Sequence, residues 1–359
     1  MRSFTMTINL FIVLLSIYNI PAIGQEGSLF DHAEPLELIL EADVVALIED
    51  KSEEPEYTSA LLIHKLPENS IHAFDLKVKP RGNTRRLTEL CDFPPLKFNL
   101  KKGQIKNTVF DGHDKLKFVS QCKQTEEFQH YVLEEYLLYQ TYNILTEESY
   151  RTRLVHITIK DIKLRMPIIR MTGFLIEDDE DLAKRIDAKP FKERVYSQDS
   201  CYESAVDRLS VFQYMIGNTD WYINTRHNTD VFQKIGGELI PVPFDFDFAG
   251  VINTIYASPS KQVPIIQVTQ RYFKGSCRPT DAYDATILLF NEKKEEIYSL
   301  YSSFEYLPKY IVKKSLRYYD KFYKIINRPE LLDETFSTAC NPNVIINSSV
   351  RNPRKSKNL

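Results

Sequence analysis

The sequence predicts an α+β protein, with a β-rich first half that contains one long helix and a mostly helical second half. Short runs that alternate apolar and polar side chains, separated by turn residues, fill residues 56–126 and are typical of strands. Apolar residues recur at helical spacing over 126–145, and this spacing predominates beyond residue 200. Hydrophobic residues make up 43% of the 359 residues, which is enough to build a core and excludes a disordered chain.

The N-terminus predicts a secretory signal peptide over residues 1–24. Arg2 precedes the apolar stretch 10–17, and the small residues Ala22 and Gly24 follow at the positions that a signal peptidase requires. A membrane anchor is the alternative, but the stretch is shorter than the roughly 20 residues that span a bilayer. We therefore expect an exported protein, periplasmic or extracellular at the cell surface, with no membrane span after leader cleavage.

The cysteines favour disulfides rather than a metal site. All of them follow the leader and none has CxxC spacing, which argues against zinc. In an oxidising compartment one or two disulfides are expected, with one thiol left over. Cys91–Cys122 is the preferred pair because both residues flank the same predicted β region, and five buried thiols are the alternative. The remaining cysteines are Cys201, Cys277 and Cys340.

The expected elements follow one another along the chain. An acidic N-terminal extension, 25–55, comes first, and its residues 35–48 allow a strand or a helix. The alternation and spacing then predict strands over 72–79, 95–100, 154–159 and 168–176, and helices over 126–145, 203–216, 282–302 and 306–326. Residues 346–359 read as a disordered basic tail.

Glu135 occupies the middle of an apolar face of the predicted helix 126–145. A buried carboxylate needs a cation or several hydrogen-bond donors, because isolated burial is costly. One interpretation is that Glu135 lies at the margin of that face and is half exposed. The other is that it pairs with Lys97, which lies within a predicted strand between Leu96 and Phe98.

Residues 217–250 bring acidic side chains together around a predicted β-hairpin. Strands 229–234 and 238–244 flank Gly236-Gly237, which is predicted as a two-residue turn. That register places Asn228 opposite Asp245 with both side chains on one face. An amide oxygen beside a carboxylate suits a hard divalent cation such as Mg²⁺.

Two further aspartates extend this group. Asp247 lies on the same face if the strand continues, and Asp220 begins the loop that leads to Asn228. Asp220 as a helix cap and Asp245 as a strand end are the ordinary explanations. The combination favours a metal site, because clustered carboxylates repel one another without a cation.

These motifs resemble the CotH-type secreted kinase family, first known from spore coat proteins and with relatives in Bacteroidetes-type bacteria. The resemblance covers roughly residues 70–260 and is carried by GNTDW, RHN, PVPFDFDFAG, the KPRGN turn and the PPLKFNL strand. It implies a two-lobed atypical protein-kinase-like fold, with a β-rich N-lobe over 56–178 and a mostly helical C-lobe over 179–345. It further implies ATP with Mg²⁺ or Mn²⁺ as cofactors, and a protein or other hydroxyl acceptor.

The resemblance also implies roles for single residues. Lys97 would hold the α- and β-phosphates and pair with Glu135, and Asp220 would be the catalytic aspartate. The hinge between lobes would be 173–177 and include Glu177. The metal ligands would be Asn228, Asp245 and Asp247, with Asn224 as an alternative ligand, and the cover over the phosphates would be Arg81, Gly82 and Asn83.

Composition limits the other functions. Only 11 residues are glycine, and neither GxGxxG nor GxxxxGK[ST] occurs, which excludes a standard dinucleotide fingerprint and a P-loop. A net charge of −3 gives no electrostatic footprint for nucleic acid. Two alternatives to the kinase remain: a kinase-like binding or surface-assembly protein without turnover, and a metal-dependent DxD glycosyltransferase. A monomer is expected in each case.

Overall fold

The structure is a computed structural model that describes residues 28–67, 70–82 and 84–340. The predicted signal peptide, the basic tail and Asn83 lie outside the described residues. None of the helices in the described part of the chain is long and apolar enough to cross a membrane.

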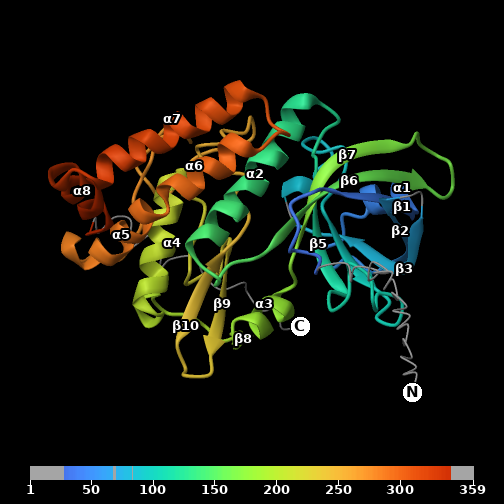
Figure 1. Cartoon of the computed structure of the whole chain (residues 1–359), viewed down its shortest axis with the longest axis horizontal. Helices are drawn as coiled ribbons and strands as arrows, with labels where there is room; N and C mark the ends of the chain where they lie inside the picture. Colours follow the sequence, from blue (N-terminus) through green and yellow to red (C-terminus); the bar gives the residue numbers. More distant parts are fainter. Residues whose placement is uncertain (1–27, 68–69, 83, 341–359) are drawn as a thin grey trace, which may run out of the picture.

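Seven strands of the first half close into a barrel (Figure 1). Closure comes from the first strand, which pairs antiparallel with the second and parallel with the sixth, more than 100 residues away along the chain. Alternate side chains of each strand, such as Leu38, Phe74 and Phe98, fill the interior. In barrel order the strands are β1 (Leu36–Ala42), β2 (Thr58–Lys65), β3 (Ile71–Pro80), β4 (Leu96–Leu100), β5 (Lys115–Ser120), β7 (Ile169–Ile176) and β6 (Thr152–Asp161).

The barrel corrects the predicted fold class. The protein is α+β overall, but the expectation of a two-lobed atypical protein-kinase-like fold is wrong, because the strands form one closed seven-stranded barrel. Residues 36–42, assigned from sequence to an extension before the β region, supply the strand that closes it. Parallel pairing between distant segments leaves no local sequence pattern that could have predicted this closure.

Apart from α1 (Val44–Glu49), which packs against β3 and β6 of the barrel, the helices lie to one side of the barrel (Figure 1). The predicted helices 126–145 and 203–216 are confirmed with those bounds, as α2 (Glu126–Leu145) and α4 (Glu203–Ile216). The others are α3 (Asp179–Arg185), α5 (Asp284–Glu292), α6 (Lys294–Ser303), α7 (Lys309–Ile326) and α8 (Pro329–Phe336). Short 3-10 turns are η2 (Thr84–Arg86), η3 (Gln198–Ser200), η4 (Thr280–Tyr283) and η5 (Ser337–Cys340). A separate sheet has the order β10 (Leu239–Pro243), β9 (Thr229–Lys234), β8 (Ala188–Pro190).

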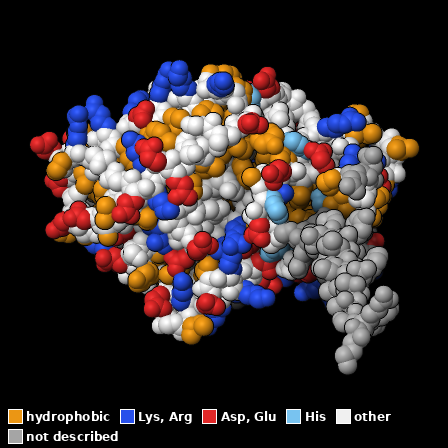
Figure 2. Space-filling model, in the orientation of Figure 1, with side chains coloured by type: hydrophobic (Ala, Val, Ile, Leu, Met, Phe, Trp, Pro, Cys, Tyr) orange, Lys and Arg blue, Asp and Glu red, His pale blue; other side chains and the backbone are white. Residues whose placement is uncertain are grey.

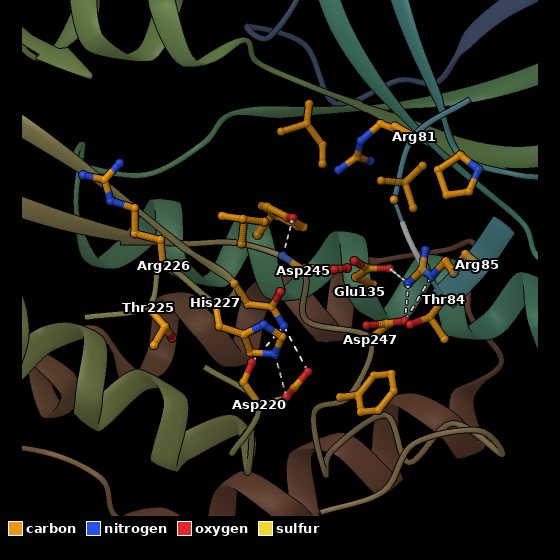
Figure 3. A pocket seen from close by; sticks show the side chains of 18 of the residues that line it. Arg81, Thr84, Arg85, Glu135, Asp220, Thr225, Arg226, His227, Asp245 and Asp247 are labelled. Carbon is orange, nitrogen blue, oxygen red and sulfur yellow. Dashed lines mark hydrogen bonds and ion pairs between the residues drawn. The ribbon is translucent and has the colours of Figure 1, made fainter. Parts of the chain in front are cut away.

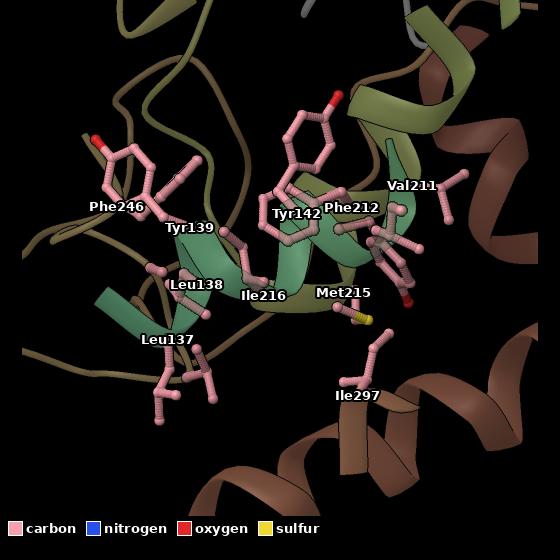
Figure 4. Close-up of a cluster of buried hydrophobic side chains, with 14 of the residues drawn as sticks. Leu137, Leu138, Tyr139, Tyr142, Val211, Phe212, Met215, Ile216, Phe246 and Ile297 are labelled. Carbon is pink, nitrogen blue, oxygen red and sulfur yellow. The ribbon is translucent and has the colours of Figure 1, made fainter. Parts of the chain in front are cut away.

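Helix α2 is the central helix. It begins at the N-cap Thr125, whose hydroxyl accepts a hydrogen bond from the backbone N–H of Phe128. It is buried on nearly all sides, between β6 and β7 of the barrel on one hand and α4 and α6 on the other. Figure 4 shows Tyr142 against Phe212 of α4, and Tyr139 against Phe246, in the core that the helices share.

Two disulfides cross-link the described residues. The predicted Cys91–Cys122 pair is confirmed, and Cys277 pairs with Cys340 across 63 residues of sequence. The fifth cysteine, Cys201, is a buried free thiol.

Candidate functional site

A cavity of about 840 Å³ lies where the barrel, α2 and the β9–β10 hairpin meet (Figure 3). Part of its wall is apolar and comes from the ends of barrel strands and of the hairpin: Pro95, Val119, Ile176 and Phe244. Most of the rest is charged or polar, and arginines as well as carboxylates line it. The volume is in the range of small-molecule and cofactor sites.

Arg85 is the centre of the charged wall. Its guanidinium lies 2.7 Å from Glu135 Oε2 and 2.8 Å from Asp247 Oδ2, and its Nε also donates to Asp247 at 3.0 Å (Figure 3). All three side chains are nearly buried. One cation therefore holds two carboxylates, with a third, Asp245, close enough to influence them.

Burial decides the protonation of this group. It raises the pKa of the Glu135 and Asp247 carboxyls, because the attraction of Arg85 offsets only part of the cost of removing their charge from water. Burial alone would lower the pKa of Arg85, but the two carboxylates outweigh it and raise that pKa well above its ordinary value. Three carboxyl groups surround one guanidinium, so an added cation would favour the ionised form of Glu135 and Asp247 and would stabilise the group in that form.

The predicted Lys97–Glu135 pair is wrong. The Lys97 ammonium lies 3.7 Å from Asp178, and Arg85 takes the place beside Glu135. The strand register explains this, because Lys97 lies directly between Lys79 and Lys117 on neighbouring strands and is outside the cavity wall. The interpretation of Glu135 as half exposed is also wrong, since only 1% of the residue is accessible.

Arg85 was missed in the sequence, although a signal was present. The run from Arg81 to Arg86 holds three arginines directly after a strand, in a turn that was predicted to cover phosphates. The turn folds as η2, which directs Arg85 toward α2. Arg81 and Gly82 line the cavity as expected, and no carboxylate of the described residues pairs with Arg81.

The predicted hairpin register is wrong by one residue. Thr229 pairs with Pro243, and Lys234 and Glu238 bracket a three-residue loop, with Gly237 in the left-handed region (φ 96°). Asn228 is therefore opposite Phe244, whose N–H donates to its carbonyl, rather than opposite Asp245.

Asn228 and Asp245 still line the same cavity. Both have left-handed backbone angles (φ 51° and 62°), which asparagine and aspartate tolerate better than most residues. The backbone N–H of Asp245 donates to the hydroxyl of Tyr139 on α2 at 2.9 Å. Its carboxylate makes no hydrogen bond with any described residue and is free to bind a ligand.

Asp220 is held from two sides. Its Oδ1 lies 2.8 Å from His227 Nε2, and Asn228 Nδ2 donates to its Oδ2 at 3.2 Å and to its carbonyl at 2.8 Å (Figure 3). The loop before it starts at Gly217, the left-handed C-cap of α4, as the sequence predicts. Asp220 thus faces the cavity in a fixed orientation, beside the candidate metal ligand Asn228.

A buried lysine that sequence reasoning missed fixes the Asp220 loop. Lys274 donates to the carbonyls of Thr219 and Trp221, the two neighbours of Asp220, at 2.9 and 2.6 Å. Its ammonium also lies 3.5 Å from the ring centroid of Tyr222. Burial lowers its pKa well below the ordinary value. No spacing in the sequence links position 274 to this loop.

Two residues that were predicted to belong to the site remain to be placed, Glu177 and Asn224. The Glu177 carboxylate binds Arg185 at 2.8 Å and accepts the backbone N–H of Arg151, so it braces the segment after β7 and is outside the cavity wall. Asn224, the alternative ligand, lines the cavity. Across the described ranges, no group of three or more His, Cys, Asp or Glu side chains is arranged to hold a metal ion by itself.

Comparison with known proteins adds no assignment to this geometry. No protein-family model matches the chain, and a search of the curated proteins finds no match.

Proposed function

We propose that the cavity binds ATP together with Mg²⁺ or Mn²⁺ and that the protein transfers the γ-phosphate to a protein or other hydroxyl acceptor, as CotH-type secreted kinases do. The observation that carries the proposal is the cluster of carboxyls around Arg85, where Glu135 and Asp247 share one guanidinium and Asp245 lies close by. A divalent cation would offset the repulsion between these carboxylates, and bound Mg²⁺ commonly also takes phosphate oxygens as ligands.

The apolar wall supports a nucleotide as the ligand. Pro95 directly precedes β4, Val119 lies on the neighbouring strand β5, and Ile176 lies on the next strand, β7. Together with Phe244 they offer flat apolar surface to a base, while Arg81, which pairs with no carboxylate of the described residues, is a cation for the phosphates. Arg81 would thus bind the phosphates, the role that the resemblance to CotH-type kinases implied for Lys97.

The residues present fit a magnesium ion that is bound mainly through phosphate. Mg²⁺ commonly takes only one or two carboxylates, with water and phosphate oxygens completing its shell. Asp245 offers a carboxylate without a hydrogen-bond partner, and the amide of Asn228 directs its nitrogen to Asp220, which leaves its oxygen for a ligand. The ion would supply charge neutralisation on the transferring phosphoryl group.

In the transfer step, Asp220 acts as the catalytic aspartate. The acceptor hydroxyl gives its proton to the Asp220 carboxylate, its oxygen forms the new bond to the γ-phosphorus, and the bond to the bridging β–γ oxygen breaks, so that ADP leaves with the electron pair. His227 and Asn228 hold the carboxylate in place for this transfer.

A second candidate is nucleotide binding without turnover. The ion pair between Arg85 and Asp247 favours it, because this pair removes one predicted metal ligand from use. Both candidates require the same cavity and differ only in phosphate transfer.

Thermal unfolding with ligands tests the proposal. We expect ATP with Mg²⁺ or Mn²⁺ to raise the melting temperature, Asp245→Asn to lose the metal-dependent part of that rise, and Asp220→Asn to keep it but lose transfer of radiolabelled phosphate. The surface variant Asp281→Asn is the matched control and should behave as the wild type. Binding by the wild type without transfer to any hydroxyl acceptor would support the second candidate. A rise in melting temperature with a sugar nucleotide but not with ATP would overturn both candidates. No rise with any nucleotide would also overturn both.

A further inference from the structure

The outward face of α7 carries cations almost without compensating carboxylates. Its single acid, Asp320, accepts a hydrogen bond from the hydroxyl of Tyr298. Within the described residues, none of the five exposed cations on this face forms an ion pair, and we call them the basic ridge: Lys309, Lys313, Arg317, Lys321 and Lys324.

This arrangement is unfavourable for the helix itself. Like charges four residues apart repel one another, and the ridge repeats that spacing from Lys309 to Lys321. Lys309 also lies in the first turn, at the positive end of the helix dipole, where α7 has no acidic residue and no side-chain cap. The apolar face, with Ile311, Tyr319 and Phe322, holds the helix in place instead. Apart from Lys324, which lies in the last turn where the dipole favours a cation, the ridge charges gain no stabilisation from the helix dipole that would account for them.

The ridge contrasts with the chain as a whole, in which 46 Lys and Arg side chains are outnumbered by 49 Asp and Glu. Helix α7 lies along the outer edge of the molecule (Figure 1), and basic side chains stand out along the same edge in Figure 2. The 18 residues of α7 extend over about 27 Å. The ridge is thus a convex, linear and mainly basic surface, with Asp320 as the single carboxylate of α7.

We propose that the basic ridge docks the protein on an anionic lipid surface. A convex ridge has no recess for a small ligand but presents all its cations to a plane of headgroups at once, and each Lys or Arg near such a plane adds favourable electrostatic energy. Exposed Tyr306 and Tyr310 lie at the N-terminal end of the ridge, and tyrosine is enriched at membrane–water interfaces. This binding is peripheral and independent of the proposed phosphate transfer.

Vesicle sedimentation with the full chain tests the proposal. The probes are vesicles of equal parts phosphatidylglycerol and phosphatidylcholine, with pure phosphatidylcholine vesicles to measure binding through apolar segments such as 10–17. We expect binding to the anionic vesicles in excess of the neutral ones at about 0.1 M salt, and loss of that excess at about 1 M salt. The variant K309Q/K313Q/K321Q/K324Q should weaken the excess binding at least about tenfold.

A variant of equal charge change provides the control. K77Q/K102Q/K106Q/K192Q removes four exposed lysines from β3 and from loops elsewhere, and it should change the excess binding less than about twofold. Circular dichroism and melting temperature establish that each variant is folded. Equal loss in both variants, or no preference of the wild type for anionic vesicles, would overturn the proposal. So would ridge-dependent binding to polyglutamate without binding to vesicles, which would indicate an acidic protein partner.

Discussion

Arg85 is the residue on which the candidate site most depends. It is the cation that contacts both Glu135 and Asp247, and all three side chains are nearly buried. Removing one partner of a buried ionic group leaves uncompensated charge, which costs more than the group itself contributes.

We therefore predict that Arg85→Met lowers the free energy of unfolding by about 3–5 kcal/mol. Urea denaturation followed by circular dichroism measures this loss. The double variant Arg85→Met/Glu135→Gln should lose less than the sum of the two single variants, because the second change removes a stranded carboxylate. Additive losses would contradict the pairing seen here.

Glu134, the neighbour of Glu135, contacts Lys314 and Ser315 of α7 instead of Arg85, and it gives the stability a pH dependence. Burial raises its pKa to about 7 from 4.5, although Lys314 and Ser315 contact the carboxylate, because Lys314 is itself half exposed. The unfolded chain releases this proton near pH 4.5 and the folded chain near pH 7. Stability from this group is therefore present below pH 4.5 and is lost as the pH rises to 7, by up to about 3 kcal/mol.

Glu134→Gln should remove that slope. We expect the unfolding free energy of this variant, measured by urea denaturation between these pH values, to fall less with pH than that of the wild type. Glu126→Gln, on the exposed first turn of the same helix, is the control and should keep the wild-type slope. A slope unchanged by Glu134→Gln would show that other groups cause it.

At the scale of elements, the turn after α4 positions the Asp220 loop. Gly217 adopts φ 71°, and a Cβ there would lie 2.0 Å from the hydroxyl of Tyr318. Gly217→Ala should thus combine backbone strain with a steric clash and cost roughly 1–3 kcal/mol.

Two other glycines separate these causes. Gly237 has φ 96° with open space around it, so Gly237→Ala should cost about 1 kcal/mol through strain alone. Gly103 has neither feature, and Gly103→Ala should stay within about 0.5 kcal/mol of the wild type. Thermal melts of the three variants measure the order, and equal melting temperatures would refute it.

Local patterns predicted single elements well and their pairing less well. The bounds of α2 and α4 followed from apolar spacing and from Gly217, which are properties of a few neighbouring residues. The hairpin register failed because Gly236-Gly237 allows both a two-residue and a three-residue loop, and packing of the sheet selected the second. The predicted partner of Glu135 was wrong for a similar reason. The sequence does not reveal which residues lie opposite Lys97, and the sheet places it in one cross-strand row with two other lysines.

At the scale of the whole molecule, closure of the barrel and assembly of the cavity depend on contacts between distant segments. The pairing of β1 with β6 and the bonds from Lys274 to the Asp220 loop both join residues too far apart for any periodicity to reveal. The α+β class and the confirmed Cys91–Cys122 pair were accessible because composition and local context determine them. The closed barrel and the positions of Arg85 and Lys274 were not.

The disulfide Cys277–Cys340 is the long-range link that can be tested most directly. It joins the segment of Lys274 to η5 near the end of the described chain and closes a loop across 63 residues. In the chain-entropy description a loop of this length stabilises the folded state by about 4 kcal/mol, because it restricts the unfolded chain. We predict that C277S/C340S lowers the free energy of unfolding by about this amount.

Cys201→Ser is the control, because its buried thiol closes no loop, so its loss of unfolding free energy should be clearly smaller. Urea denaturation under non-reducing conditions compares the two. Equal losses would mean that the disulfide adds no more than the packing of a buried sulfur, and that α8 and η5 are held by their apolar contacts alone.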